Sequence, residues 1–366
     1  MSMGGSVDLD RVGRILVGDP VRVLVIDDSS SMRRLIRHVL SLDRRVAVIG
    51  EAADAAEARE MIRALSPDVL TLDVEMPGLS GLDLLARLMQ LRPMPVVMVS
   101  SETRRGSAAA IEALALGAVD CIGKPLGLFD AEAFSGLADV LVAASTANVS
   151  GARSTPVRRG GETLGEAYRW SGRLVLIGAS TGGVDAVERV LGTFPVNCPP
   201  TVIVQHMPPS FLASFAARLD SRIAPAVSLA VDGAPLRQGH IYLAPGGPHH
   251  LTIAGSQSLT CQLLAESKRN GHRPSVDLTL ESALPVASSV VAAVLTGMGR
   301  DGAGGLRALR EAGARTLAQD EASSVVWGMP RAAWEAGGAE ELVPLDRIGP
   351  RLLDLCARSS AALPAA

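Results

Sequence analysis

Three residues of the types that form a hydrolase triad each follow a probable strand. They are Ser180 after the apolar run 174–177, His206 after 202–204 and Asp301 after 293–295. Apolar runs that end in glycine and polar residues are typical of buried parallel strands. Ligands of an open α/β sheet bind at the carboxyl ends of the strands. A serine hydroxyl needs a base to become a nucleophile, and a carboxylate orients that base. The pattern therefore predicts serine hydrolase chemistry.

The turn around the serine fits a known type of nucleophile turn. It reads Gly178-Ala179-Ser180-Thr181-Gly182, which matches the G-x-S-x-G elbow, where small residues allow a tight strand-to-helix turn. The plainer interpretation of this segment alone is a serine N-cap flanked by glycines. The chain order Ser…His…Asp differs from the Ser…Asp…His order of α/β-hydrolases, so the sequence indicates a separate arrangement of the same chemistry.

A second reactive group lies at predicted strand ends in the first third of the chain and consists of Asp27, Asp28, Asp73, Ser100 and Lys124. Neighbouring strand ends would crowd three carboxylates into one cleft, where repulsion raises at least one pKa. A hard divalent cation such as Mg²⁺ relieves this repulsion with oxygen ligands and retained water. With a hydroxyl and a lysine nearby, the set suits phosphoryl transfer onto a carboxylate. One aspartate alone could simply cap a helix.

The hydrophobic pattern predicts two α/β halves that would position these residues. The first half has predicted strands at 22–27, 46–50, 68–73, 95–100 and 119–123, with helices near 31–41, 54–65, 81–91 and 106–117. This alternation implies a parallel sheet with right-handed crossovers. It resumes at Arg173. An antiparallel insertion is predicted from short β-like runs at 226–230, 240–244 and 259–264.

Composition narrows the environment and the partners. The 366-residue chain is 48% hydrophobic and 20% charged, with a net charge of -3, which gives no reason to expect nucleic acid or an anionic membrane as a partner. Its 4 cysteines include no CxxC pair, which favours a reducing cytoplasm. No long apolar segment predicts a signal peptide or a transmembrane helix. We therefore expect a cytoplasmic protein that is not inserted in a membrane.

The first half resembles the receiver domains of two-component response regulators. The motifs that carry this resemblance are Val25-Ile26-Asp27-Asp28-Ser29, Leu72-Asp73-Val74-Glu75-Met76-Pro77, Val99-Ser100 and Gly123-Lys124-Pro125. The resemblance implies that Asp73 is the phosphoacceptor and that a histidine kinase is the phosphodonor. It also implies a Mg²⁺ site made by Asp27, Asp28, Asp73 and the backbone carbonyl of Glu75.

The same resemblance implies that two further residues respond to the acyl phosphate, namely Ser100 and Lys124. One position departs from the usual receiver pattern. Cys121 stands where receivers often carry an aromatic side chain. The usual relay through an aromatic rotamer therefore cannot be assumed here.

The second half resembles the effector domain of bacterial chemotaxis protein-glutamate methylesterases. The motifs are Gly178-Ala179-Ser180-Thr181-Gly182-Gly183, Gln205-His206-Met207-Pro208, His272-Arg273-Pro274-Ser275-Val276-Asp277, Leu295-Thr296-Gly297-Met298-Gly299-Arg300-Asp301-Gly302 and the segment 318–330. This resemblance implies that Ser180, His206 and Asp301 are the triad, and that Thr181 and Met298 lie near the oxyanion. It implies hydrolysis of glutamate methyl esters, and deamidation of glutamines, on methyl-accepting chemoreceptors. It implies no cofactor for the esterase reaction.

Together the two resemblances imply an α/β protein with a (βα)5 receiver and a doubly wound, mainly parallel methylesterase domain that carries an antiparallel hairpin insertion. The expected order is an N-terminal extension (1–20), receiver (21–143), linker (144–171), catalytic domain (172–358) and tail (359–366). The resemblance also implies that the unphosphorylated receiver covers the active-site face of the effector and that phosphorylation activates the esterase.

Two alternatives from other functional classes remain at this stage. The segment Gly297-Met298-Gly299-Arg300-Asp301-Gly302 is formally G-x-G-x-x-G, a pattern that binds dinucleotides when it joins a strand to a helix. The effector could also be a binding module without catalysis.

Among the other histidines, the pair His249-His250 predicts no metal site, because adjacent residues of an extended segment point in opposite directions. His272 with Arg273 could orient a substrate or cap a helix.

Overall fold

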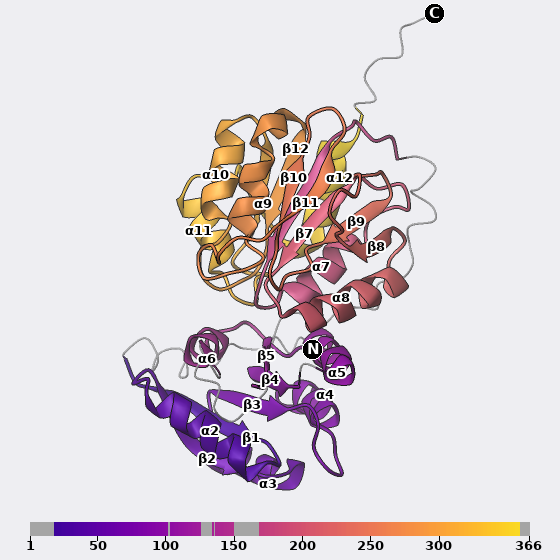
Figure 1. Ribbon diagram of the computed structural model, residues 1–366. Coiled ribbons are helices and arrows are strands. Elements are labelled where there is room, and N and C mark those ends of the chain that lie inside the picture. Colours follow the sequence, from indigo (N-terminus) through magenta and orange to yellow (C-terminus); the bar gives the residue numbers. More distant parts are fainter. Residues whose placement is uncertain (1–17, 102, 126–133, 135, 150–167, 359–366) are drawn as a thin grey trace, which may run out of the picture. The chain divides into compact units, whose positions relative to one another are not determined.

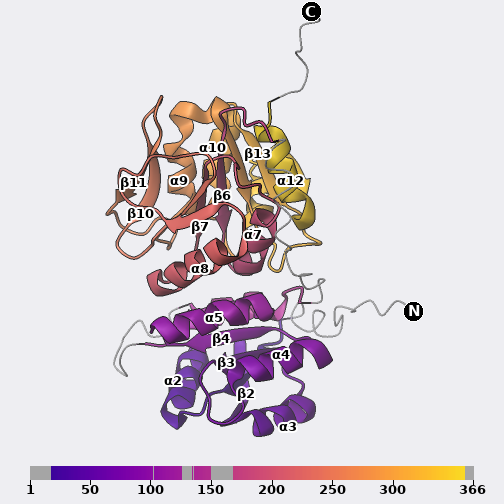
Figure 2. The same ribbon diagram turned by 90° about the vertical axis from the view of Figure 1, so that its right-hand side faces the viewer.

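The computed structural model describes residues 18–101, 103–125, 134, 136–149 and 168–358. The chain divides into two compact units, residues 1–153 and 154–366. Figure 1 and Figure 2 draw the elements of both units. Outside the described residues lie most of the predicted N-terminal extension, residues 150–167 of the predicted linker and the predicted tail.

The first unit is built on a five-stranded parallel sheet with the order β2-β1-β3-β4-β5. Its strands are β1 (Val21–Ile26), β2 (Val46–Ala52), β3 (Val69–Asp73), β4 (Val96–Ser100) and β5 (Asp120–Gly123). The central strands β3 and β4 are buried along their whole length, which is why they read as unbroken apolar runs. The order places the ends of β1 and β3 side by side. The predicted parallel sheet is confirmed.

Helices lie on both sides of this sheet (Figure 2). They are α2 (Ser30–Ser41), α3 (Ala55–Leu65), α4 (Gly81–Leu91), α5 (Arg104–Leu116) and α6 (Leu137–Ser145). The first four begin at a side chain that accepts a backbone N–H, an arrangement that favours helix starts; these caps are Ser29, Asp54, Ser80 and Thr103. Helix α6 was not among the predicted helices, and it packs on β1 and β4.

The second unit contains a seven-stranded sheet with the order β14-β13-β12-β6-β7-β9-β8, in which every neighbouring pair is parallel. Its strands are β6 (Leu174–Ala179), β7 (Thr201–Gln205), β8 (Ala226–Leu229), β9 (His240–Leu243), β12 (Val290–Val294), β13 (Arg315–Gln319) and β14 (Glu341–Val343). In this order β6 is flanked by β12 and β7, so their carboxyl ends meet at one edge.

One prediction about this unit is wrong. The runs 226–230 and 240–244 were expected in an antiparallel insertion, but β8 and β9 extend the main sheet in parallel. The antiparallel hairpin consists of β10 (His250–Ala254) and β11 (Thr260–Leu264). Short apolar runs indicate strands without specifying their direction, which depends on long-range pairing. The predicted insertion is therefore confirmed only for the hairpin.

The helices of the second unit are α7 (Gly183–Leu191), α8 (Pro209–Arg222), α9 (Val276–Ser282), the 3-10 helix η2 (Leu284–Ser289), α10 (Ala303–Glu311), α11 (Met329–Glu335) and α12 (Leu345–Cys356). The start of the unit is fastened to α12: the Tyr168 hydroxyl donates to the Leu353 carbonyl at 3.3 Å, and Trp170 forms a bridge with Ala357. These contacts fix the entry into β6.

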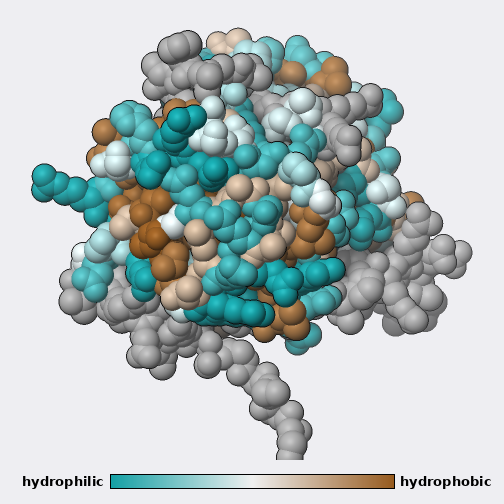
Figure 3. Space-filling model, turned by 90° about the horizontal axis from the view of Figure 1, so that it is seen from below, coloured by the Kyte–Doolittle hydropathy of each residue, from teal (hydrophilic) through white to brown (hydrophobic). Residues whose placement is uncertain are grey.

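Figure 3 shows a face on which hydrophilic residues predominate, with hydrophobic residues in small groups between them. Large exposed apolar side chains in the first unit include Leu42 and Leu91, which lie on different helix ends. Within the described ranges, no helix combines the length and hydropathy needed to cross a bilayer.

Candidate active site

The sheet order brings the three predicted triad positions to one edge. Ser180 follows β6, His206 follows β7 and Asp301 lies beyond β12, the three adjacent strands of the sheet. Backbone hydrogen bonds fix the first two positions: Ser180 N donates to the Thr296 carbonyl at 3.0 Å, and His206 N donates to the Ala179 carbonyl at 3.2 Å. Residues far apart in the sequence are thus held together by strand pairing.

His206 and Asp301 form a direct pair. Nε2 of His206 lies 3.0 Å from Oδ2 of Asp301, and the two side chains are 7% and 1% exposed. Nδ1 of His206 is also buried, and it has no hydrogen-bond partner among the described residues. A carboxylate accepts from an imidazole N–H, so the proton on the neutral ring belongs on Nε2. Nδ1 is then the nitrogen that can accept a proton.

The Asp301 carboxylate is held by four further donors. Oδ2 accepts from Val276 N at 2.7 Å, while Oδ1 accepts from Ser275 Oγ at 3.0 Å, Asp277 N at 3.2 Å and Asn270 Nδ2 at 3.2 Å. Burial alone would raise the pKa of Asp301, but the hydrogen bond with His206 and the donors on both oxygens outweigh it and lower that pKa. The surrounding donors therefore favour the charged form of Asp301 and fix the orientation of its carboxylate.

A second buried carboxylate stands beside the first. The Asn270 amide bridges the two, because Nδ2 also donates to Oδ2 of Asp277 at 2.7 Å. Asp277 accepts from Gly305 N at 2.7 Å as well. Burial, reinforced by the negative charge of Asp301, raises the pKa of Asp277. The sequence had assigned no role to Asn270, Ser275 or Asp277, although the last two belong to the motif 272–277.

Two buried polar side chains hold the backbone of the turn at Ser180 and Thr181 in place. Gln205 Nε2 donates to the Ser180 carbonyl at 2.8 Å. The Thr296 hydroxyl donates to the Thr181 carbonyl at 3.0 Å and accepts from Val326 N at 3.0 Å. Sequence reasoning missed both roles, although both residues lie inside the quoted motifs. The hydrogen bonds orient the peptide planes of the turn, which a reaction at Ser180 requires.

The remaining predicted near-site positions are compatible with oxyanion binding. Thr181 is buried, and Met298 is half-buried in the loop after β12. The Met298 N–H donates to no group in the described part of the chain. A free backbone N–H beside a nucleophile can stabilise the negative oxygen of a tetrahedral intermediate. The role of Thr181 and Met298 stays a prediction.

Two glycines of the 297–302 segment, Gly297 and Gly302, serve close packing. A Cβ at Gly297 would lie 2.4 Å from the Met329 sulfur and 2.8 Å from the Ser180 Cβ, and one at Gly302 would lie 2.7 Å from Val276. The Asp301 carboxylate of the same turn is directed at His206. Protein atoms thus occupy the turn that a pyrophosphate would need, which counts against dinucleotide binding there.

The other histidines have distinct surroundings. Both ring nitrogens of the buried His250 are used, because Nε2 contacts the Ser267 carbonyl at 3.0 Å and Nδ1 accepts from Ser275 N at 3.1 Å. His250 therefore supports the segment that holds Asp301. The ring of His272 stacks on His206 with centroids 3.8 Å apart. The Arg273 guanidinium donates to the Gly247 and Glu266 carbonyls.

The first unit carries the predicted acidic cluster. Carboxylate oxygens of Asp27, Asp28 and Asp73 lie within 4.8 Å of one another. Lys124 Nζ bridges two of them, at 3.0 Å from Asp27 Oδ2 and 2.8 Å from Asp73 Oδ2. Burial and the charge of Asp27 raise the pKa of Asp73 to about 6 against the opposing effect of Lys124. The excess negative charge and the oxygen donors fit a hard divalent cation.

The receiver positions around this cluster are as follows. Ser100 is buried at the end of β4, and its hydroxyl donates to the Gly106 carbonyl at 3.0 Å. Glu75 is exposed, and its N–H donates to Asp73 Oδ1 at 3.2 Å. Burial raises the pKa of the Cys121 thiol well above its usual value. At neutral pH this thiol is therefore an uncharged, small group.

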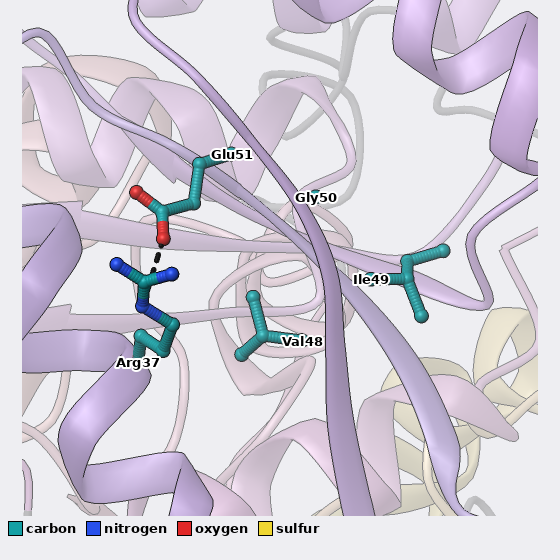
Figure 4. Close-up of a pocket in the computed structure, with 5 residues that line it drawn as sticks. All are labelled: Arg37, Val48, Ile49, Gly50 and Glu51. Atoms are coloured by element: carbon teal, nitrogen blue, oxygen red, sulfur yellow. Dashed lines mark ion pairs between the residues drawn. The ribbon is translucent and has the colours of Figure 1, made fainter.

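A hollow elsewhere in the first unit contains none of these groups. It is lined by Arg37 of α2 and by residues 48–51 of the edge strand β2 (Figure 4). Arg37 Nε lies 3.0 Å from Glu51 Oε1, and Arg33 Nε lies 3.4 Å from Glu51 Oε2. The carboxylate is already neutralised by two arginines, so we assign the hollow no ligand.

Comparisons with known proteins match both units. A CheB methylesterase family model matches residues 175–352, and a response regulator receiver domain model matches residues 23–132. A protein-glutamate methylesterase/protein-glutamine glutaminase of Rhizobium johnstonii is 52% identical over 340 residues, which cover 92% of this chain and 97% of that protein. One from Caulobacter vibrioides is 50% identical over 342 residues, with 92% and 98% covered. The crystal structure of the Thermotoga maritima CheB methylesterase catalytic domain is 38% identical and covers 50% of this chain and 99% of that chain, with a TM-score of 0.49.

Proposed function

Because the chain belongs to the family of protein-glutamate methylesterases/protein-glutamine glutaminases, we propose that Ser180, His206 and Asp301 are the triad of its esterase unit. The protein is a response-regulator enzyme of chemotaxis signalling that hydrolyses glutamate methyl esters and deamidates glutamines. The observation that carries the site assignment is the 3.0 Å pair between His206 Nε2 and Asp301 Oδ2 at the strand ends that flank the strand of Ser180.

In the proposed mechanism, acylation uses these three residues. Ser180 Oγ attacks the carbonyl carbon of the glutamyl ester, and Nδ1 of His206 takes the hydroxyl proton. The carbonyl oxygen becomes an anion, which backbone N–H groups near Thr181 and Met298 would stabilise. The carbon–methoxy bond then breaks as Nδ1 returns the proton to the departing oxygen, which leaves as methanol. A glutamine substrate releases ammonia by the same steps.

Deacylation repeats the sequence with water. Nδ1 removes a proton from water as the water oxygen attacks the acyl-enzyme carbonyl. The bond from carbon to Ser180 Oγ breaks, and the proton passes to Oγ, so the enzyme is restored and a glutamate carboxylate is released. Asp301 keeps its charge throughout, because its pKa is lowered by the donors around it. It orients the ring and stabilises the imidazolium that forms twice per turnover.

For the receiver we propose that Asp73 accepts a phosphoryl group from a histidine kinase. Asp27, Asp28, Asp73 and the backbone carbonyl of Glu75 would hold a Mg²⁺ ion, which when bound neutralises phosphoryl oxygens beside these carboxylates. Lys124, already 2.8 Å from Asp73 Oδ2, is placed to pair with the new phosphoryl group. Ser100 would give up its bond to Gly106 and turn towards that group.

We further propose that the protein works in the cytoplasm on the glutamate-bearing helices of methyl-accepting chemoreceptors. The family names, the receiver unit and the four buried, unpaired cysteines support this setting. Such receptors would present the ester on their cytoplasmic part, where a kinase also supplies phosphoryl groups. The esterase reaction as written uses only protein groups and water.

A serine-directed reagent tests the esterase assignment against a non-catalytic binding module. We expect the full chain to hydrolyse a generic carboxylic ester and to be inactivated by a fluorophosphonate. Peptide mass spectrometry should then place the label on Ser180. Absence of turnover, or inactivation with the label on another residue, would contradict the assignment.

A further inference from the structure

The ring of His272 lies flat against the ring of His206. The centroids are 3.8 Å apart, and the planes differ by 3°. The backbone around His272 is fixed by a reciprocal pair of hydrogen bonds with Arg269, at 2.9 Å and 3.0 Å. The next side chain, Arg273, is tied to the carbonyls of Gly247 at 2.6 Å and Glu266 at 2.7 Å. The segment that carries His272 is therefore held in place by hydrogen bonds of its backbone and of the neighbouring Arg273.

We propose that His272 is a positioning residue of the esterase reaction, which acts by stacking its ring on His206 so that Nε2 stays on Asp301 and Nδ1 stays available as the base. This inference rests on the proposed function, because it presumes that His206 is the base. It assigns His272 no bond to the substrate and no proton transfer.

The base needs such a constraint because its two nitrogens are used unequally. Nε2 has the Asp301 carboxylate at 3.0 Å, whereas the buried Nδ1 has no partner among the described residues. A half-turn of the ring about the Cβ–Cγ bond would exchange Nε2 with Cε1 and Nδ1 with Cδ2, so that Asp301 would face a carbon atom and the base would leave its position. Asp301 itself cannot move to follow, because Val276 N, Ser275 Oγ and Asn270 Nδ2 hold its oxygens. A parallel ring at van der Waals distance resists tilting of the base.

The electrostatic surroundings keep the stacking ring neutral. The titratable groups that act on His272 are His206, Asp301 and Lys268. Burial, together with His206 and Lys268, lowers the pKa of His272 to about 4 against the opposing effect of Asp301. A neutral aromatic face attracts a neighbouring cation, whereas a second charged ring would repel it. The imidazolium that forms on His206 during each step thus gains a compatible neighbour.

The segment 270–277 therefore contacts two members of the triad. His272 stacks on the base, and Asn270, Ser275 and the backbone of residues 276 and 277 donate to the carboxylate. These contacts account for the motif 272–277. From the sequence, its histidine could either orient a substrate or cap a helix. Helix α9 is capped by Ser275, whose hydroxyl accepts from Leu278 N.

Replacement of His272 by Ala and by Phe separates stacking from acid–base chemistry. We expect His272→Ala in the phosphorylated full chain to lower kcat for methanol release from methylated receptor about tenfold, with KM within about twofold, because misplacement of a base reduces turnover. His272→Phe keeps a flat ring but cannot carry a proton, and it should recover kcat to within about threefold of the parent. The pH profile of His272→Phe between about pH 5 and 9 should superimpose on that of the parent, since the parent ring is neutral over that range.

Several outcomes would overturn the proposal. These are a His272→Phe variant as slow as His272→Ala, an effect of His272→Ala on KM alone, or no effect at all. Circular dichroism melting of both variants checks the fold, and if the Ala variant does not fold, the Phe variant alone decides. Ser180→Ala measured in parallel separates this inference from the function on which it rests. An active Ser180→Ala variant would refute the proposed triad itself. An inactive Ser180→Ala variant together with parent-like His272 variants would refute only the stacking role.

Discussion

At the scale of single residues, the orientation of one imidazole decides which atoms react. His206 uses Nε2 for Asp301, so in the proposed mechanism the proton transfers with substrate run through Nδ1. This division follows from the position of His206 directly after β7 and of Asp301 in a turn whose carboxylate is saturated by donors. Among the described residues, no hydrogen bond joins the Ser180 hydroxyl to His206, an arrangement common before substrate closes a site.

The receiver site gives a prediction at the same scale. Asp73→Asn should abolish phosphorylation by acetyl phosphate, because an amide oxygen is a poor nucleophile towards phosphorus. Incubation of the parent with Mg²⁺ should add one phosphoryl group, which intact-protein mass spectrometry measures, and a chelator should prevent it. Asp19→Asn, an exposed aspartate of the same unit, is the matched control and should label like the parent. Labelling of Asp73→Asn at the parent level would refute the assignment.

At the scale of elements, parallel strands that end together explain why the sequence could group the three residues of the proposed triad. The runs before Ser180, His206 and Asp301 are buried on both faces, so their apolar composition identifies them and the polar residues beyond them mark the sheet edge. The sequence could not specify the direction of β8 and β9, because four-residue strands carry too little pattern. The contacts made by Asn270, Thr296 and His272 were missed as well, since they depend on how loops cross one another.

The turn between β6 and α7 can be tested as an element. Gly182 has φ 76°, and a Cβ there would lie 2.6 Å from Val325. In Gly182→Ala, the left-handed backbone alone should lower the free energy of unfolding by about 1–2 kcal/mol. The clash of the new Cβ with Val325 should lower it further. The variant should also lose most of its esterase activity. Gly313→Ala is the matched control, because its φ is 96° and no atom lies within 4 Å of the added carbon. Gly313→Ala should be destabilised only by the strain of a left-handed backbone, and it should keep its esterase activity. Urea unfolding and ester hydrolysis measure both; equal stability and activity of the two variants would contradict this account of the turn.

At the scale of the whole molecule, two α/β units divide regulation from chemistry. The acidic cluster and its lysine lie in the first unit, and the paired histidine and aspartate lie in the second. A phosphoryl group on Asp73 adds negative charge and strong acceptor oxygens to a buried site, which can shift a receiver between two surface states. Because Cys121 stands where receivers often carry an aromatic side chain, we propose that Ser100 and Lys124 carry that shift.

Separation of the units tests the regulatory claim. A fragment starting near residue 165, which retains the contacts of Tyr168 and Trp170 with the C-terminal helix, should hydrolyse receptor methyl esters faster than the unphosphorylated full chain. Phosphorylation of the full chain should close most of that gap, since regulatory couplings of about 1–3 kcal/mol change rates roughly 5–150-fold. Initial rates of methanol release at equal enzyme concentration decide the matter. Equal rates for fragment and unphosphorylated chain would mean that the receiver does not inhibit.

The most direct test of the central claim is methanol release by Ser180→Ala from a methylated chemoreceptor in the presence of Mg²⁺ and a small phosphodonor. We predict a rate at least about 10³-fold below that of the parent, because triad members act as one unit. The fold should survive, since loss of one hydroxyl at a strand end costs at most ~1 kcal/mol, and thermal unfolding checks this. A folded Ser180→Ala variant that releases methanol at a near-parent rate would show that Ser180 only caps a turn and that the chemistry lies elsewhere.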